Sequence, residues 1–205
     1  MTVLTPKFGM GASVLRKEDN AFISGKGRYT DNFSPDGVLH LYVLRSPSAR
    51  ATFTIKSTKA AQGAPGVHLV LTGADLAHLG DLKSGAMQKQ PDGTRAPTRD
   101  IPILCKDTVN YVGDAVALVV ANTRAEAQDA AEMIEVDYKD LDPVARTEMA
   151  LDPDAPLVWP ELGSNRALRY EIGSAAKTDA AFAKAAHVTK TAFRNNRLVC
   201  NYMET

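Results

Sequence analysis

The sequence predicts a soluble α+β domain in which a twisted mixed sheet carries few helices. Short runs with strand character recur along the first two thirds of the chain, and one well-marked amphipathic helix lies between two of them. The 205 residues are 44% hydrophobic and 23% charged, which is ordinary for a globular protein. This length suits one domain plus an additional segment.

The chain opens with a predicted lead-in followed by two strands. Residues 1–36 are rich in Gly, Asp, Lys and Arg without a sustained period, so we expect an extended lead-in that lies across another surface. The strand-like run 37–45 stops at Ser46-Pro47, because proline removes a donor from the ladder. Residues 51–56 then alternate apolar and polar side chains, as a half-buried strand does.

A short Ala-rich helical turn and a third strand, 67–72, come next. Thr72 and Asp75 form a capping-box-like start for a brief helix that ends at Leu79. Residues 80–100 are polar, contain Gly and Pro, and show no period. A loop of that length in a compact chain is usually functional or mobile.

The second half contains the clearest elements. Asp114 opens a continuous apolar run that ends at Ala121, the pattern of a strand covered on both faces. Thr123 with Glu126 predicts a capping box that opens a helix. An alternating strand, 135–138, follows this helix, and the order predicts a βαβ-like or split βαβ unit. The helix places four apolar residues on one face: Ala127, Ala130, Ala131 and Ile134.

A Pro-rich stretch from Leu141 to Pro160 predicts a boundary. Beyond it we expect a strand at 168–172, a helix at 178–186 and an alternating strand at 187–194. The predicted divisions are therefore a lead-in, a central domain, and a linker with the beginning of a further domain: 1–36, 37–150 and 151–205.

Composition disfavours several classes of function. Because 24 Lys and Arg balance 24 Asp and Glu, no net field gathers phosphates or anionic lipid, and neither nucleic-acid nor membrane-surface binding is expected. The first ten residues lack a basic stretch followed by a long apolar core, so no signal peptide is expected, and no apolar stretch approaches the ~20 residues that a membrane span needs. Cys105 and Cys200 lie far apart, which argues against a disulfide framework or local zinc or iron–sulfur site and fits a cytoplasmic setting.

The usual catalytic motifs are missing from the sequence. It has no phosphate-binding GxxxxGK[ST] loop and no HExxH, and Gly9-Met10-Gly11 lacks the strand and third glycine of a dinucleotide fingerprint. The two serines that flank Pro47 do not form the GxSxG elbow of a hydrolase. Four histidines lie in different elements and are interpreted as structural or surface residues: His40, His68, His78 and His187.

Two polar stretches are nevertheless candidates for an interface. Arg45-Ser46-Pro47 puts a guanidinium at a strand exit, where it could pair with a carboxylate or anchor a partner surface. A solvated arginine at a strand end is the alternative interpretation.

The other candidate is the strand entrance at Tyr111 to Asp114, where Gly113 suits a bulge or a close backbone approach. A carboxylate buried without partners is costly, so Asp114 must accept hydrogen bonds or reach water. No other acid or histidine lies close in sequence to complete a catalytic pair, which favours a structural role for this aspartate over a catalytic one.

Both stretches belong to a longer series of segments, which in chain order are GKGRYTDN, VLRSPSARA, APGVHLVLTGADL, YVGDAVALVVA and IEVDY. Their order and spacing, over nearly the whole chain, resemble the N-terminal α/β hammerhead domain of molybdenum hydroxylase large subunits, the family of xanthine dehydrogenase, aldehyde oxidase and aerobic carbon monoxide dehydrogenase. Two departures, Arg50 where histidine is common and Ala115 where proline is common, leave the subfamily open.

The end of the chain resembles one branch of that family. Residues 171–205 are similar to the segment by which carbon monoxide dehydrogenase-type large chains enter the molybdopterin-binding domain, and Glu204 stands in a similar short motif. The resemblance therefore implies the opening part of a longer polypeptide.

The family resemblance also implies a reaction, oxidative hydroxylation of a small molecule with water-derived oxygen. It implies a molybdenum–molybdopterin cofactor, expected as the cytosine dinucleotide, in the complete subunit, and iron–sulfur clusters and FAD on small and medium partner subunits. The catalytic and cofactor-binding residues are expected after position 205, so this chain alone is expected to bind no cofactor and to be inactive. Carbon monoxide, purines, aldehydes and N-heterocycles stay open as substrates.

On this interpretation the chain's own candidate residues serve contacts with the cofactor domain or a partner subunit: Arg45, Ser46, Pro47, Tyr111, Gly113, Asp114 and Glu204. One alternative is a stand-alone hammerhead module for interaction or assembly. Its end would be expected to be polar, whereas LVCNYMET is apolar and strand-like. Another alternative, a small-molecule binding domain with residues 80–100 as a lid, rests on loop length alone.

Overall fold

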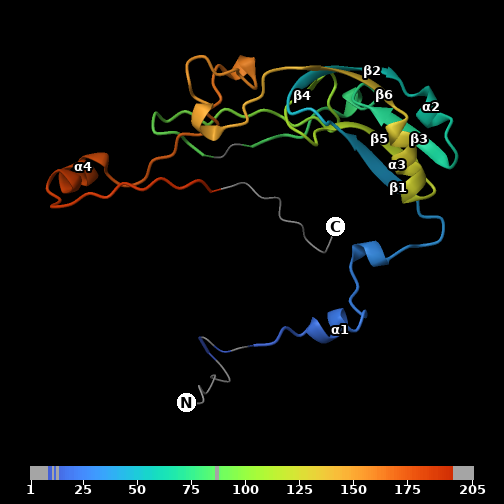
Figure 1. Ribbon diagram of the computed structural model, residues 1–205, viewed down its shortest axis with the longest axis horizontal. Helices are drawn as coiled ribbons and strands as arrows, with labels where there is room; N and C mark the ends of the chain where they lie inside the picture. The colour runs from blue at the N-terminus through green and yellow to red at the C-terminus, as the bar shows by residue number, and fades with distance from the viewer. Residues whose placement is uncertain (1–8, 11, 13, 86–87, 196–205) are drawn as a thin grey trace. The chain divides into compact units, whose positions relative to one another are not determined.

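The structure is a computed structural model that describes residues 9–10, 12, 14–85 and 88–195 (Figure 1). Contacts divide the chain into two units, Met1–Asp36 with Lys190–Thr205, and Gly37–Thr189. The first unit contains a short helix, α1 (Asp19–Ile23), and a 3₁₀ turn, η1 (Thr30–Asn32). The prediction of an extended lead-in was wrong at these two elements. Arg16, three residues before α1, pairs with Asp19 at the start of the helix (2.8 Å).

The second unit is built on two small antiparallel sheets, each of three strands. The predicted class, mixed α and β with few helices, is confirmed, but two antiparallel sheets stand in place of one mixed sheet. The first sheet has the order β1 (His40–Arg45), β5 (Ala115–Ala121), β3 (Val67–Thr72). The second has the order β4 (Thr108–Val109), β2 (Ala51–Ser57), β6 (Glu135–Asp140).

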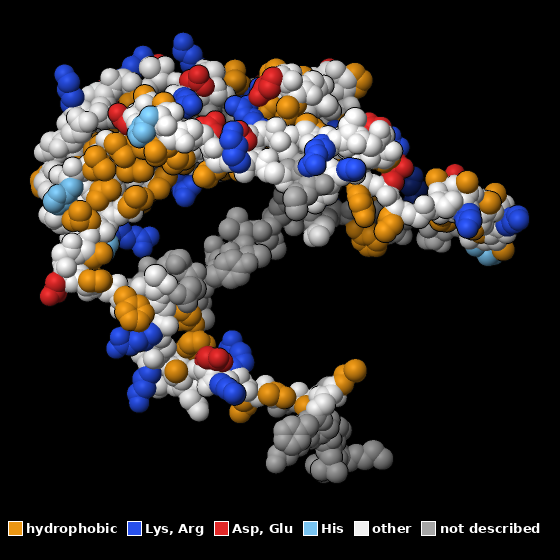
Figure 2. All heavy atoms as spheres, turned by 180° about the vertical axis from the view of Figure 1, so that it is seen from behind, with side chains coloured by type: hydrophobic (Ala, Val, Ile, Leu, Met, Phe, Trp, Pro, Cys, Tyr) orange, Lys and Arg blue, Asp and Glu red, His pale blue; other side chains and the backbone are white. Residues whose placement is uncertain are grey.

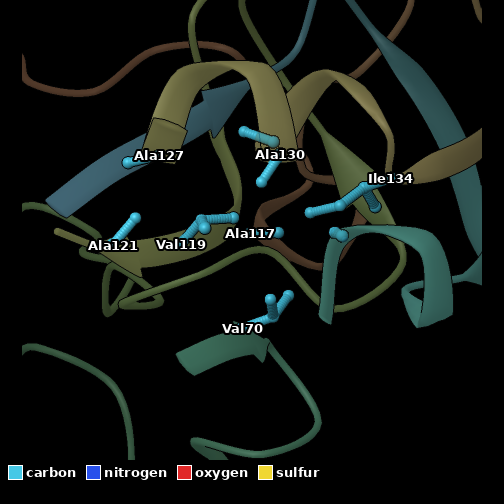
Figure 3. Packing of buried hydrophobic residues seen from close by; sticks show 9 residues of the cluster. Val70, Ala117, Val119, Ala121, Ala127, Ala130 and Ile134 are labelled. Atoms are coloured by element: carbon cyan, nitrogen blue, oxygen red, sulfur yellow. The ribbon is translucent and has the colours of Figure 1, made fainter. Parts of the chain in front are cut away.

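The predicted helix after β5 is confirmed as α3 (Arg124–Glu132). Its capping box forms as expected: the Glu126 amide donates to Thr123 Oγ1 at 3.2 Å, and the Thr123 amide donates to the Glu126 carboxylate at 2.9 Å. The predicted apolar face of α3, with Ile134 just after the helix, is buried over the first sheet, mainly against β1 and β5 (Figure 3).

The predicted βαβ unit is wrong, although its strand–helix–strand order is present. β5 lies in the first sheet, whereas β6 pairs antiparallel with β2 in the second. The physical reason lies in β6, whose exposed and half-buried residues alternate. That pattern suits an antiparallel sheet with one solvated face, whereas the strands of a parallel sheet are buried on both faces.

The remaining helices are short. Thr72 donates to the Asp75 carboxylate from both its amide and its hydroxyl at 2.7 Å, as a capping box would. These bonds close a turn, and the brief helix that was expected to end at Leu79 is a single 3₁₀ turn, η2 (Ala77–Leu79).

The other helical elements of the second unit are α2 (Lys59–Gln62), η3 (Thr147–Met149), η4 (Pro160–Leu162) and α4 (Ala175–Ala183). No helix in the described part of the chain is long and apolar enough to cross a membrane.

Two predicted strands, 168–172 and 187–194, are not formed. All residues from 168 to 195 are exposed, and a strand without a neighbour has no ladder to stabilise it. Between them α4 begins three residues before the expected helix, because Ser174 Oγ accepts the Lys177 amide (3.4 Å) and so caps it.

Candidate functional site

The structure brings the two predicted polar stretches together, although they lie 68 residues apart. The Ser46 amide donates to the Asp114 carbonyl and the Gly113 amide to the Ser46 carbonyl, both at 2.8 Å. The Arg45 guanidinium donates to the Gly113 carbonyl at 2.8 Å. They meet because β1 pairs with β5, with a register shift between Leu44 and Arg45 at this end. We call Arg45, Ser46, Tyr111, Gly113 and Asp114 the β5 entrance.

Two features of the β5 entrance have local structural explanations. The buried hydroxyl of Ser46 donates to the Ser48 carbonyl and accepts the Ser48 amide, both at 3.0 Å, which closes the bend at exposed Pro47. Gly113 adopts a φ of +97°, a conformation that residues with a Cβ rarely adopt. The close backbone approach expected at this glycine is present in its bond to Ser46.

Asp114 is buried, with 9% of its surface exposed, and its carboxylate accepts the Asn110 amide at 2.9 Å. The expectation that this group must accept hydrogen bonds is met. Its neighbours are weak acids held in their neutral forms. Burial, then the Asp114 charge and a hydrogen bond to it, raise the pKa of the Cys105 thiol to about 12. Burial and the same carboxylate raise the pKa of Tyr111. This arrangement does not generate a nucleophile near neutral pH.

Beside the β5 entrance lies a cavity of about 690 Å³ that sequence reasoning did not find. Asp114, Cys105 and Tyr111 line it from the strand side, and the Pro-rich segment with Trp159 lines the other. Arg99 connects its walls: it pairs with Glu161 at 2.8 Å and lies 5.7 Å from the centroid of the Trp159 ring. The one feature of the sequence that could have pointed to this cavity is Trp159, the chain's single tryptophan.

The Pro-rich segment is fixed to the domain by hydrogen bonds. The Arg50 guanidinium donates to the carbonyls of Asp142 (3.0 Å) and Leu157 (2.7 Å). The Asn165 side chain donates to the carbonyls of Ala150 and Pro156, both at 2.9 Å. Residues predicted as a linker therefore complete the wall of the cavity, and Arg50 holds them there.

The described residues supply no ligand set for a metal. They contain no group of three or more His, Cys, Asp or Glu side chains that could hold a metal ion. His68 shares a hydrogen bond with Asn122 (2.7 Å), and His78 shares one with the Asp75 carbonyl (3.0 Å). Glu204 and Cys200 lie outside the described residues.

Comparison with protein families matches residues 24–142 to the a/b hammerhead domain of aldehyde oxidase and xanthine dehydrogenase. The chain is 36% identical over 201 residues to the nicotine 6-hydroxylase large subunit of Paenarthrobacter nicotinovorans, covering 96% of this chain and 23% of that protein. It is 34% identical over 213 residues to the carbon monoxide dehydrogenase large chain of Afipia carboxidovorans, covering 96% and 25%. The chain thus spans about a quarter of the length of these curated relatives.

Solved structures agree with these matches. The Cu,Mo-CO dehydrogenase superposes with a TM-score of 0.67 at 34% identity, covering 87% of this chain and 23% of that one. Quinoline 2-oxidoreductase from Pseudomonas putida 86 gives a TM-score of 0.58 at 39% identity, covering 69% and 18%.

Proposed function

The chain belongs to the aldehyde oxidase and xanthine dehydrogenase family, whose a/b hammerhead domain it contains, and from this membership we propose that it is the N-terminal part of a molybdenum hydroxylase large subunit. The observation that carries the proposal is the match over 96% of this chain to a hydroxylase large subunit of which it covers only 23%. A fold hosts many functions, so the proposal rests on this extended similarity and not on the hammerhead alone.

The proposed reaction is oxidation of a small substrate by hydroxylation. For an N-heteroaromatic substrate a C–H bond is replaced by a C–OH bond, with the oxygen taken from water. Carbon monoxide has no C–H bond, so there the oxygen of water is added to the carbon and carbon dioxide forms. In both reactions two electrons and two protons leave for each turnover. The molybdenum cofactor, expected as the cytosine dinucleotide, supplies the oxygen-transfer chemistry when bound. Electrons pass to iron–sulfur clusters and FAD on partner subunits. Because the described residues do not supply a metal ligand set, we derive no catalytic step from them.

The role that we propose for this chain is structural. Its two small sheets form a rigid platform, and the β5 entrance with its cavity is the proposed contact for the cofactor domain or a partner subunit. Support comes from Tyr111 and Val112, which are 58% and 64% exposed at the tip of this entrance. Exposed aromatic and aliphatic side chains next to a fixed backbone are suited to contact another protein surface.

The relatives are named for several substrate classes. Nicotine 6-hydroxylase and quinoline 2-oxidoreductase are named for N-heteroaromatic compounds, the carbon monoxide dehydrogenase chains for carbon monoxide, and others for xanthine or aldehydes. We propose that the complete enzyme acts on an N-heteroaromatic compound or on carbon monoxide, because nicotine 6-hydroxylase and the carbon monoxide dehydrogenase of Afipia carboxidovorans match 96% of this chain, whereas the xanthine dehydrogenase subunit of Bacillus subtilis matches 70%. Molybdenum-dependent oxidation of nicotine, quinoline and carbon monoxide, each measured with an artificial electron acceptor, distinguishes them.

The experiment that tests the assignment is the intact mass of the native polypeptide, with molybdenum measured in the same chromatographic peak. We expect a chain several times heavier than 22.0 kDa that carries molybdenum. A metal-free polypeptide near 22.0 kDa would overturn the enzyme assignment in favour of the stand-alone hammerhead module.

A further inference from the structure

In the described part of the chain, helices cover one face of the first sheet, and the second buried cluster covers the other face only at the start of β5, where Val116 is fully buried. Helices α2 and α3 contact its strands, and both lie on the side of the main buried cluster. Side chains from all three strands join that cluster: Tyr42 and Leu44, Ala117, Val119 and Ala121, and Val67 and Val70. Since successive residues of a strand point to opposite faces, the intervening residues of each strand lie on the other face.

That other face consists of two apolar rows that run across the three strands. In antiparallel pairs, residues directly opposite one another share a face. The strand register aligns Leu41 with Val120 and Val120 with Leu69. It also aligns Val43 with Leu118 and Leu118 with Leu71. We call these six residues the open face.

The open face is exposed to solvent in the described part of the chain. Leu41 is 56% exposed and Leu69 45% exposed, one on each edge strand, and the other four are partly buried. None of the six belongs to a described buried cluster. Figure 2, seen from behind relative to Figure 1, shows hydrophobic side chains gathered over this sheet. Leu39, two residues before Leu41, extends the apolar surface and is 46% exposed.

A surface of this kind is expected to be covered. Burial of apolar side chains lowers the free energy of a protein in water, and contiguous apolar patches on soluble proteins mark contact sites. The sequence of β5, AVALVVA, has no polar residue on either face, which is the pattern of a strand buried on both sides. In the described residues α3 covers one of those sides, and on the other side only Val116 is packed in the second buried cluster, which leaves Leu118 and Val120 partly exposed.

We propose that the open face is the docking surface for the part of the same polypeptide that follows residue 205 in the complete large subunit. The inference rests on the proposed function. Relatives extend well beyond this chain, which spans only 23% and 25% of two of them, so about three quarters of such a polypeptide is available to cover the face. The six residues carry no charge or hydrogen-bonding side chain, a composition typical of permanent interfaces, whereas separable partners meet through more polar surfaces.

The test measures solvent access to single cysteines in the complete, native large subunit, purified away from other subunits. Leu41→Cys and Leu69→Cys place a thiol on each edge of the open face. Met133→Cys, at the end of α3, is the matched control because Met133 and Leu69 are equally exposed, at 45%. Maleimide labelling at each position is followed by peptide mass spectrometry, which separates these thiols from Cys105 and Cys200, and is normalised to the rate in denaturant.

We expect the thiols at 41 and 69 to react at least about tenfold more slowly than the thiol at 133, since only transient opening would expose them. Two edge positions are used because one substitution alone could disturb its strand. Labelling as fast as at 133 would overturn the proposal. Protection that is lost on dilution, or that needs the other subunits present, would also overturn it and would identify a second copy or a partner subunit as the occupant.

The labelling experiment and the intact-mass experiment that tests the proposed function can fail independently. A native polypeptide of 22.0 kDa without molybdenum would refute the hydroxylase assignment. A longer, molybdenum-containing polypeptide with reactive thiols at 41 and 69 would retain the assignment and refute the docking surface.

Discussion

At the scale of single residues, Asp114 is the side chain whose role is most open to test. Its carboxylate accepts the Asn110 amide and lies beside the neutral side chains of Cys105 and Tyr111. Asp114→Ala removes the acceptor of a buried backbone donor, which costs about 1–3 kcal/mol. In the complete enzyme we therefore expect lower stability or less assembled enzyme, with unchanged turnover per bound molybdenum, measured by thermal unfolding, molybdenum content and steady-state kinetics.

Asp114→Asn is the matched control for this prediction. The amide oxygen of asparagine can still accept the Asn110 amide, so this variant is expected to retain most of the stability that alanine loses. A normal molybdenum content with abolished turnover in either variant would contradict a structural role for Asp114.

Cys105 gives a second prediction, in alkaline solution. Its folded-state pKa is raised to about 12 from 9.0, so at high pH the folded chain retains a proton that the unfolded chain has lost. The stabilisation by the neutral thiol is complete below pH 9 and is lost as pH rises toward about 12.

The measurement is the free energy of unfolding of this chain in urea at pH 8.5 and 10.5 for the wild type and Cys105→Ala. The wild type should lose more stability than the variant between these pH values, by about 1.4 kcal/mol per pH unit for each proton. Burial is the first cause of the raised pKa values of Tyr111 and Tyr138 and is present in both proteins, whereas the smaller effect of the Cys105 charge on these tyrosines is lost with Cys105 and counts as part of its contribution. Equal losses would show that Cys105 titrates normally.

The individual residues of the β5 entrance could be predicted from sequence because each has a local signal. Arg45 stands at the end of one predicted strand, and Gly113 and Asp114 stand at the start of another. Their assembly could not be predicted, because it depends on the pairing of β1 with β5 across 68 residues and on a shift in register. Arg99 and Trp159 were missed for the same reason. Their contact joins an irregular loop to a Pro-rich segment, and neither has a periodic pattern.

At the scale of elements, the capping box of α3 can be compared with the cap of α4. Thr123 caps a helix with three buried residues, whereas Ser174 caps a helix with none. Thr123→Ala is therefore expected to lower the free energy of unfolding by about 1 kcal/mol. Ser174→Ala should change it by less than about 0.5 kcal/mol. Urea denaturation of both variants checks this, and equal effects would mean that α4 packs as firmly as α3.

The turn after β3 contains a close backbone contact that requires glycine. A Cβ at Gly73 would lie 2.5 Å from the Cys105 carbonyl oxygen and 2.9 Å from that of Leu104. Because backbone cannot move aside as a flexible side chain can, Gly73→Ala is expected to cost about 1–3 kcal/mol. Gly85→Ala, with nothing within 4 Å of its Cβ, is the control and should be close to neutral. A neutral Gly73→Ala in the same urea titration would show that this turn opens freely.

The elements that the sequence predicted well are those with strong local signals. The capping box and apolar face of α3 are both present, since they depend on residues within two turns of one another. The two-residue strand β4 was missed, because such a strand exists only through its pairing with β2. The prediction of a βαβ unit was wrong for a similar reason. The local sequence pattern predicts that each strand forms, but it does not predict which sheet the strand joins.

At the scale of the whole molecule, the domain and the residues after it differ in what stabilises them. Residues 37–167 include both buried clusters, and the hydrogen bonds of Arg50 and Asn165 attach the Pro-rich segment to them. From 168 to 195 every described residue is exposed, including Ile172 at 87% and Phe193 at 90%. The divisions at 36 and 150 stay predictions, and these exposed residues are the part that a longer polypeptide would have to complete.

The strands predicted at 168–172 and 187–194 allow a test of whether a longer polypeptide supplies pairing partners for these exposed segments. Their sequences favour strands, yet no described strand pairs with them, and a strand gains its stability from neighbours. If this chain is the opening part of a large subunit, both segments should find partners in the complete polypeptide. Their amides should then exchange with deuterium at least about tenfold more slowly there than in the 205-residue chain. The amides of α3, which is packed in this chain already, should exchange alike in both and serve as the control. Equally fast exchange of the two segments in both forms would show that strand propensity without a partner, and not an incomplete domain, explains their sequence.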